Sequence, residues 1–167
     1  MHVVVMGVSA TGKTEVGKQL AEELGCEFVE GDSLHPRANI EKMENGVPLT
    51  DDDRWPWLEA IGSRIAELDR AGSCTVVTCS ALKRAYRDVL RRAAPVFFVH
   101  LDAPYTVLEQ RMSQRSKHFM PTSLLASQFE TLEPLDDDEA GAVVDVEPPL
   151  DEVVEEAVNA VRVQYTD

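Results

Sequence analysis

The sequence predicts a three-layer α/β fold built around a parallel sheet of five strands. Short β-rich runs alternate along the chain with segments of helical periodicity, which is the order of a parallel α/β protein. The runs are almost entirely apolar, as in strands that are buried on both faces. A glycine-rich loop follows the first run directly, at the edge where parallel sheets bind ligands. With 167 residues and 44% hydrophobic content, the chain is expected to form a single domain over residues 1–167.

Each strand and helix has its own signal in the sequence. A first helix is indicated by apolar residues at helical spacing up to Leu24, and Gly25 suits its C-terminal cap. The segment 27–30, which follows this helix, is expected to lie beside the first strand as part of a βαβ unit. The five expected strands are residues 2–6, 27–30, 74–79, 96–101 and, with a weaker pattern, 142–146. The later helices are marked by the apolar sets Leu58/Ile61/Ile65/Leu68, Leu82/Tyr86/Val89/Leu90, Val107/Leu108/Met112 and Leu150/Val153/Val154/Ala157/Val158/Val161.

The charge, the cysteines and the apolar runs of the chain argue against several classes of function. The net charge of −14 opposes binding to nucleic acids and to anionic membranes, so neither is an expected partner. The three cysteines, Cys26, Cys74 and Cys79, have no metal-ligand spacing, and we expect them to be reduced structural thiols in a cytoplasmic protein. The short apolar run at the N-terminus lacks a basic flank, and no run approaches the roughly 20 residues that span a bilayer.

The loop "GVSATGKT" matches the phosphate-binding pattern GxxxxGK[ST] between a strand and a helix. Its backbone N–H groups and the following helix N-terminus are expected to bind the phosphates of ATP. Lys13 is a candidate catalytic residue at the β- and γ-phosphates, and Thr14 is a candidate ligand of Mg²⁺. An ordinary glycine-rich turn is the alternative, and the loop does not separate a kinase from a GTPase or a mechanical ATPase. The predicted ATP-binding residues of the loop are Gly7, Val8, Ser9, Ala10, Thr11, Gly12, Lys13 and Thr14.

Acidic side chains follow the second strand in "FVEGDSLHP". Asp32 is the candidate that orients the attacking hydroxyl and accepts its proton, and His35 is a rival base that is also placed in the substrate site. The third strand ends in "TCSALK" without an acid, so Glu30 or Asp32 must serve the metal, and we assign Glu30. The alternative is a turn that begins at Asp32 and Ser33.

Basic side chains in two further segments are candidates for holding an acidic substrate. "GVPLTDDDRWPWL" contributes Arg54, and "SALKRAYRDVLRR" contributes Lys83, Arg84 and Arg87. A guanidinium or ammonium group suits a carboxylate. We assign Arg54, Lys83 and Arg87 to the substrate site, although a solvated helical face explains several of these charges equally well.

The segment "EQRMSQRSKHFMP" is basic within an acidic chain. Arg111 and Arg115 lie four residues apart on a predicted helix and are expected to bind ATP, with Arg115 also catalytic and His118 in the substrate site. We interpret residues 111–122 as a lid that closes over ATP. A helix whose cations balance nearby acids is the alternative.

Together these segments resemble the gluconate kinase family of small-metabolite P-loop kinases. The resemblance rests on "GDSLHPRANIEKMENGVPLTDDDRWPWL", "CSALKRAYRDVLR" and "HFMPTSLLASQFETLE", in that order after the loop. It implies a fold like that of nucleoside monophosphate and shikimate kinases, and transfer of the ATP γ-phosphoryl group to the 6-hydroxyl of D-gluconate. It also implies a Mg²⁺ requirement and a homodimer.

Two residues depart from the family pattern, and two rival functions remain. Ala10 stands where the family generally has glycine. Alanine is harmless there only if its φ is negative and its side chain points away from the phosphate. Glu30 stands where many members carry aspartate. Glutamate keeps the negative charge of aspartate but has a longer side chain. The rivals are a kinase for another small metabolite and a nucleotide-binding regulator without turnover.

Overall fold

The computed structural model describes residues 1–114 and 123–166. Its strands are β1 (His2–Met6), β2 (Glu27–Glu30), β3 (Thr75–Thr78), β4 (Phe97–Asp102) and β5 (Gly141–Asp145). They form one parallel sheet in the order β2-β3-β1-β4-β5. The expected five-stranded parallel sheet is confirmed, with strand ends shifted by a residue or so. The expectation that the second strand lies beside the first is wrong, because β3 lies between β2 and β1.

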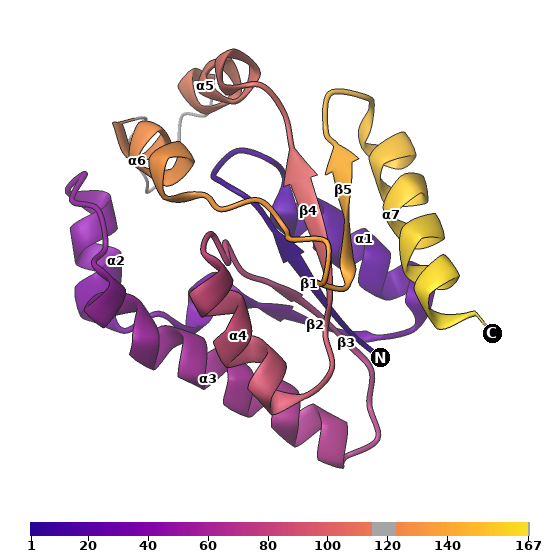
Figure 1. Cartoon of the computed structure of the whole chain (residues 1–167). Helices are drawn as coiled ribbons and strands as arrows, with labels where there is room; N and C mark the ends of the chain where they lie inside the picture. Colours follow the sequence, from indigo (N-terminus) through magenta and orange to yellow (C-terminus); the bar gives the residue numbers. More distant parts are fainter. Residues whose placement is uncertain (115–122, 167) are drawn as a thin grey trace.

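Helices cover both faces of this sheet, which gives the three expected layers (Figure 1). α1 (Lys13–Leu24) and α7 (Leu150–Tyr165) pack together on one face, while α3 (Asp51–Arg70) and α4 (Arg84–Ala93) pack together on the other. The remaining helices are η1 (Gly31–Leu34), α2 (Arg37–Glu44), α5 (Tyr105–Ser113) and α6 (Ser123–Thr131). None of the helices in the described ranges is long and apolar enough to cross a membrane.

The central strands carry the core. All residues of β1 and β3 are buried, as their apolar sequences predict. The edge strand β2 is only partly buried and pairs with β3 alone. Gly25 caps α1 in a left-handed conformation, and Thr50 caps α3 through a reciprocal capping box with Asp53. These caps fix where the chain leaves α1 and where it enters α3.

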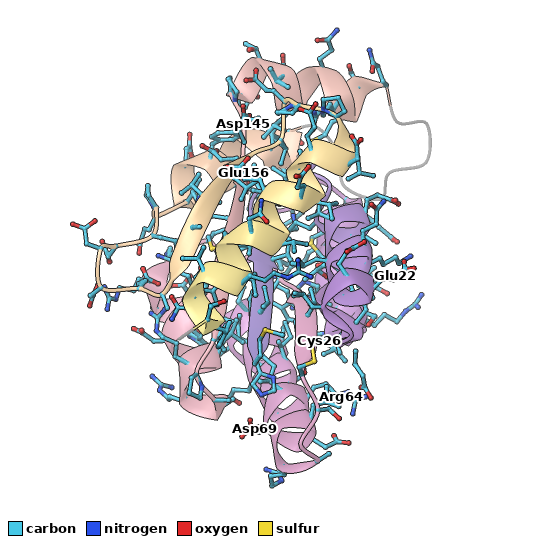
Figure 2. All side chains as sticks on the ribbon, turned by 90° about the vertical axis from the view of Figure 1, so that its right-hand side faces the viewer. Glu22, Cys26, Arg64, Asp69, Asp145 and Glu156 are labelled. Carbon is cyan, nitrogen blue, oxygen red and sulfur yellow. A yellow bond between two sulfur atoms is a disulfide. The ribbon has the colours of Figure 1, made fainter. Side chains whose placement is uncertain are left out.

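Two of the three cysteines form a disulfide, so the expectation of reduced thiols is wrong for them. Cys26 and Cys74 are bonded across a sequence separation of 48, and Cys79 is free and buried. Cys26 precedes β2 and Cys74 precedes β3, so the parallel pairing of these strands brings the cysteines together. Figure 2 shows Cys26 far from Asp145, the last residue of β5. The disulfide therefore lies at the end of the sheet opposite the carboxyl ends of the strands.

Candidate active site

The phosphate-binding loop joins β1 to α1 and has the backbone shape that its glycines allow. Gly7 has a φ of 146°, and a Cβ there would lie 2.6 Å from the carbonyl oxygen of Leu101. Gly12 has a φ of 86° at the N-cap of α1. The Lys13 ammonium donates to the carbonyl oxygens of Gly7 (3.0 Å) and Val8 (2.9 Å). The loop therefore curls around the lysine at the N-terminus of a helix, as an anion-binding loop requires.

Ala10 has a φ of 69° and is buried. The condition under which alanine would be harmless here, a negative φ, is not met. A Cβ in this left-handed region approaches the backbone, so Ala10 carries strain that glycine would avoid. The loop keeps its shape in spite of this strain, with the backbone N–H of Ser9 donating to Oε1 of Gln128 in α6 at 2.7 Å.

Glu30 and Thr14 lie together at the carboxyl end of β2. The Thr14 hydroxyl donates to Oε2 of Glu30 at 2.6 Å, and the Thr78 hydroxyl donates to Oε1. A hydroxyl beside a carboxylate is an oxygen-donor set that suits Mg²⁺, which commonly takes one or two protein ligands together with phosphates and water. In the described part of the chain, no three His, Cys, Asp or Glu side chains gather to hold a metal ion. The fit to a magnesium ion shared with a nucleotide rests on the adjacent oxygens of Thr14 and Glu30.

A pocket beside the loop brings together side chains from five separate segments of the chain. It is lined by Lys13, Asp32, His35, Arg54 and Trp57, among others. Asp32 lies in η1 immediately after β2, and Arg54 lies in the second turn of α3. The pocket thus brings a carboxylate and a guanidinium together with the lysine of the phosphate-binding loop. Of the predicted site residues, Ser9, Lys13, Asp32, His35 and Arg54 line this pocket together.

His35 is buried in this pocket. Its ring stacks on Trp57 with centroids 3.9 Å apart, and the Trp57 indole donates to the carbonyl oxygen of Gly31 at 2.8 Å. Burial, with a further contribution from the positive charge of Arg54, lowers the pKa of His35 to about 4. At neutral pH the imidazole is therefore uncharged.

Arg54 and Lys83 are joined by a network around Tyr86. Arg54 donates to the Tyr86 hydroxyl at 2.8 Å, and that hydroxyl donates to Asp51. Burial and the bond to Asp51 raise the pKa of Tyr86 to about 12. Lys83 pairs with Asp51 at 3.3 Å, so it belongs to this network and is absent from the pocket lining. Of these two predicted substrate ligands, Arg54 lines the pocket and Lys83 does not.

The prediction that Arg87 binds substrate is wrong. Its side chain is fully buried and forms an ion pair with Glu139, with Nε 2.7 Å from Oε2, and it also donates to the carbonyl oxygen of Ala81 at 2.9 Å. Arg84 also turns away, toward Asp136 and Asp138 on the surface. Arg84 and Arg87, two of the four arginines of α4, therefore tie this helix to the segment before β5.

Of the predicted lid, only the beginning belongs to the described residues. Arg111 donates to the carbonyl oxygen of Val146 at 2.6 Å and lines a second pocket with Thr11, Gly12 and Val16. It therefore lies beside the phosphate-binding loop, on the side of α1. Arg115 and His118 lie outside the described residues.

The sequence analysis missed one buried residue that contacts a pocket side chain and one that lines the pocket and holds the loop. Asn39 of α2 is buried and contacts His35, and Gln128 of α6 lines the pocket and holds the loop at Ser9. The spacing of His35 and Asn39, four residues apart, was an available signal. No signal within its own segment connects Gln128 to a loop 119 residues away.

The fold and the pocket together define the class of protein to which this chain belongs. A phosphate-binding lysine that lines one pocket with an acceptor-side carboxylate is the arrangement of a P-loop phosphotransferase. Residues 3–135 match the family model described as AAA domain. The structure resembles shikimate kinase from Aquifex aeolicus over 99% of both chains, with a TM-score of 0.66 at 19% identity, which shows the fold.

Closer relatives give the particular family. Gluconokinase from Gluconobacter oxydans is 52% identical over 157 residues, which cover 93% of this chain and 88% of the relative. A gluconokinase from Sinorhizobium meliloti 1021, known from its crystal structure, is 52% identical with a TM-score of 0.89, covering 98% of this chain and 92% of that chain. The chain therefore belongs to the AAA domain family and, within it, to the gluconokinases.

Proposed function

We propose that this protein transfers the γ-phosphoryl group of ATP to the 6-hydroxyl of D-gluconate, giving 6-phospho-D-gluconate and ADP. The observation that carries the proposal is the single pocket shared by Lys13, Asp32 and Arg54. It combines a phosphate-binding cation, a proton acceptor and a group that binds a carboxylate. Gluconokinase relatives that match nearly the whole chain support the choice of substrate.

On the donor side, the loop from Gly7 to Thr14 binds the phosphates of ATP. Lys13, with Arg111 and Arg115, stabilises the negative charge that grows on the transferred group and the leaving oxygen. Thr14 and Glu30 would hold Mg²⁺, which neutralises charge on the phosphate oxygens when it is bound. The hydrogen bond between Thr14 and Glu30 supports this assignment, because it already places both oxygen donors side by side.

On the acceptor side, Asp32 orients the 6-hydroxyl and takes its proton late in the transfer. A bond forms between O6 and the γ-phosphorus. The bond from that phosphorus to the bridging oxygen breaks, and its electron pair leaves with ADP. Arg54 binds the carboxylate of gluconate, because its guanidinium lines the same pocket as Lys13 and Asp32 and suits a carboxylate. Lys83, acting through Asp51 and Tyr86, keeps Arg54 in place.

The remaining parts of the proposal concern the whole chain. The protein acts as one kinase domain over residues 1–167, with residues 111–122 as its lid. It works as a homodimer, for which the family resemblance is the support. It works in the cytoplasm, where ATP is supplied.

The test is a steady-state assay with Mg·ATP and a panel of sugar acids, shikimate and nucleoside monophosphates, with products identified by mass. D-gluconate is expected to give the highest kcat/KM. Asp32→Asn keeps the size of the side chain but cannot accept the proton, so kcat should fall by about two to four orders of magnitude while the KM for ATP changes little.

Asp52→Asn is the matched control, because Asp52 is an exposed residue in the first turn of α3. Its kcat should equal that of the unmodified protein. A higher kcat/KM for shikimate or a nucleotide would refute the substrate assignment, and an absence of turnover with every acceptor would favour a nucleotide-binding regulator.

A further inference from the structure

The side chain that contacts His35 from α2 determines which of its ring nitrogens carries the proton. Asn39 is 3% exposed, and its amide nitrogen lies 2.8 Å from the carbonyl oxygen of Asp53. A carbonyl oxygen only accepts hydrogen bonds, so the atom that faces it is the nitrogen of the amide and not its oxygen. The orientation of the Asn39 amide is therefore fixed by the backbone of α3.

The same amide nitrogen lies 3.2 Å from Nδ1 of His35. An amide NH₂ group donates two hydrogen bonds and accepts none, so Nδ1 must be the acceptor. In a neutral imidazole the proton then resides on Nε2. A ring in this tautomer cannot accept a proton at Nε2, which removes His35 as a rival to Asp32 for the role of base.

The Nε2 atom lies on the side of the ring that faces Asp32. It is 3.9 Å from Oδ1 of Asp32, which is too far for a direct hydrogen bond. Both residues line the acceptor pocket. One oxygen atom at an ordinary hydrogen-bond distance of about 2.8 Å from both can accept from Nε2–H and donate to the carboxylate. A substrate hydroxyl has that combination of donor and acceptor.

We propose that Asn39 is a positioning residue, which holds His35 in the Nε2–H tautomer so that His35 donates to the acceptor hydroxyl whose proton Asp32 takes. The identity of that hydroxyl as O6 of gluconate rests on the proposed function. During transfer the hydroxyl proton moves to Asp32, O6 bonds to the γ-phosphorus, and the bridging oxygen leaves with its electron pair. His35 keeps its own proton throughout and orients the lone pairs of O6.

The tautomer is tested directly by ¹⁵N NMR of the unmodified protein labelled at histidine, at neutral pH and without substrate. The chain has four histidines, and the His35→Gln spectrum identifies the signal that belongs to His35. A one-bond coupling to hydrogen is expected at Nε2 and not at Nδ1. A proton on Nδ1, or on both nitrogens, would overturn the proposal. This readout does not depend on which substrate the enzyme uses, so it stands apart from a failure of the proposed function.

Kinetics test the consequence with two substitutions of the same residue. The amide nitrogen of glutamine can take the place of Nε2, whereas that of asparagine matches Nδ1 and does not reach the substrate. His35→Gln is therefore expected to keep kcat within about tenfold, and His35→Asn to lose about a hundredfold or more, as for other oriented donors. Equal activity of the two variants would refute a donor at the Nε2 position.

Asn39→Asp replaces the donor with an acceptor and favours the opposite tautomer, so kcat should fall about as far as in His35→Asn. The loss should disappear in the background of His35→Gln, which has no tautomer to set. Asn45→Asp, at an exposed position at the end of α2, is the control. Additive losses in the double variant would mean that Asn39 has a structural role only.

Discussion

Ala10 adds backbone strain to the phosphate-binding loop. Its φ of 69° lies in the region where an alanine costs about 1–2 kcal/mol relative to an unstrained position. Glycine adopts this conformation freely, although it loses roughly 0.5–1 kcal/mol more chain entropy on folding. The strain in the loop is therefore only partly offset by the smaller entropy loss of alanine.

Ala10→Gly is expected to stabilise the protein by about 1 kcal/mol or less, which raises Tm by roughly 2–4 °C per kcal/mol for a chain of this size. Thermal unfolding followed by circular dichroism measures the change. The control is Ala60→Gly at an exposed position inside α3, where the same substitution should lower stability by about 1 kcal/mol. A lower Tm for Ala10→Gly would mean that its methyl group contributes packing that outweighs the strain.

Residues close to a motif were predictable, and residues that depend on distant partners were not. Lys13, Thr14 and Glu30 follow from the loop pattern and from the end of a strand, and the structure places them together. Arg87 looks in the sequence like any cation of an amphipathic helix. Its role is set by Glu139, which lies 52 residues later and becomes a neighbour only in the folded chain.

At the level of elements, the strands were predictable from their apolar runs, but their order was not. The sequence shows that β2 follows α1, yet the position beside β1 belongs to β3. A run of four residues such as Glu27–Glu30 carries little information about its neighbours, because pairing depends on the whole sheet. The helices α2 and α6 were not predicted, because they are short and their amphipathic patterns are weak beside the charges and motifs of the same segments.

The buried pair of Arg87 and Glu139 fastens α4 to the segment that leads into β5. Burial by itself would raise the pKa of Glu139, but hydrogen bonds from Arg87, the Asp136 backbone and Arg91 outweigh it and lower the pKa to about 2. The folded pKa is thus below the ordinary value of 4.5. This contribution to stability is fully present above pH 4.5 and is lost as the pH falls through about 2.

Glu139→Gln is expected to destabilise the protein by about 3–5 kcal/mol at neutral pH, because it leaves the charge of Arg87 buried without a counter-ion. Between pH 5 and pH 2, the free energy of unfolding should then depend less steeply on pH than in the unmodified protein. Denaturant titrations across this range measure both effects. Glu41→Gln, which breaks an exposed pair with Arg37 in α2, should change stability by less than about 0.5 kcal/mol.

For the molecule as a whole, the disulfide closes a loop that contains the proposed acceptor residues and one proposed magnesium ligand. The loop that it closes runs from Cys26 to Cys74 and contains Glu30, Asp32, His35 and Arg54. Closing a loop of this length reduces the entropy of the unfolded chain by an amount worth about 4 kcal/mol. Within the described residues, the disulfide joins the chain just before the edge strand β2 to the chain just before its neighbour β3.

Reduction of the disulfide is therefore expected to lower Tm by roughly 10 °C. The measurement is a thermal scan with and without a dithiol reductant. The Cys26→Ser/Cys74→Ser variant should melt at the lower temperature under both conditions. If reductant leaves the Tm of the unmodified protein unchanged, the bridge does not stabilise the fold.

The disulfide also determines the outcome when a protease cuts the backbone between Cys26 and Cys74. The segment between the two cysteines includes exposed positions, such as Arg37, whose side chain is 89% exposed and open to a protease that cuts after basic residues. A single cut there leaves the two pieces of chain covalently joined through Cys26 and Cys74. The nicked protein keeps its full mass until a reductant is added, and only then can the N-terminal piece, with the phosphate-binding loop, separate from the rest.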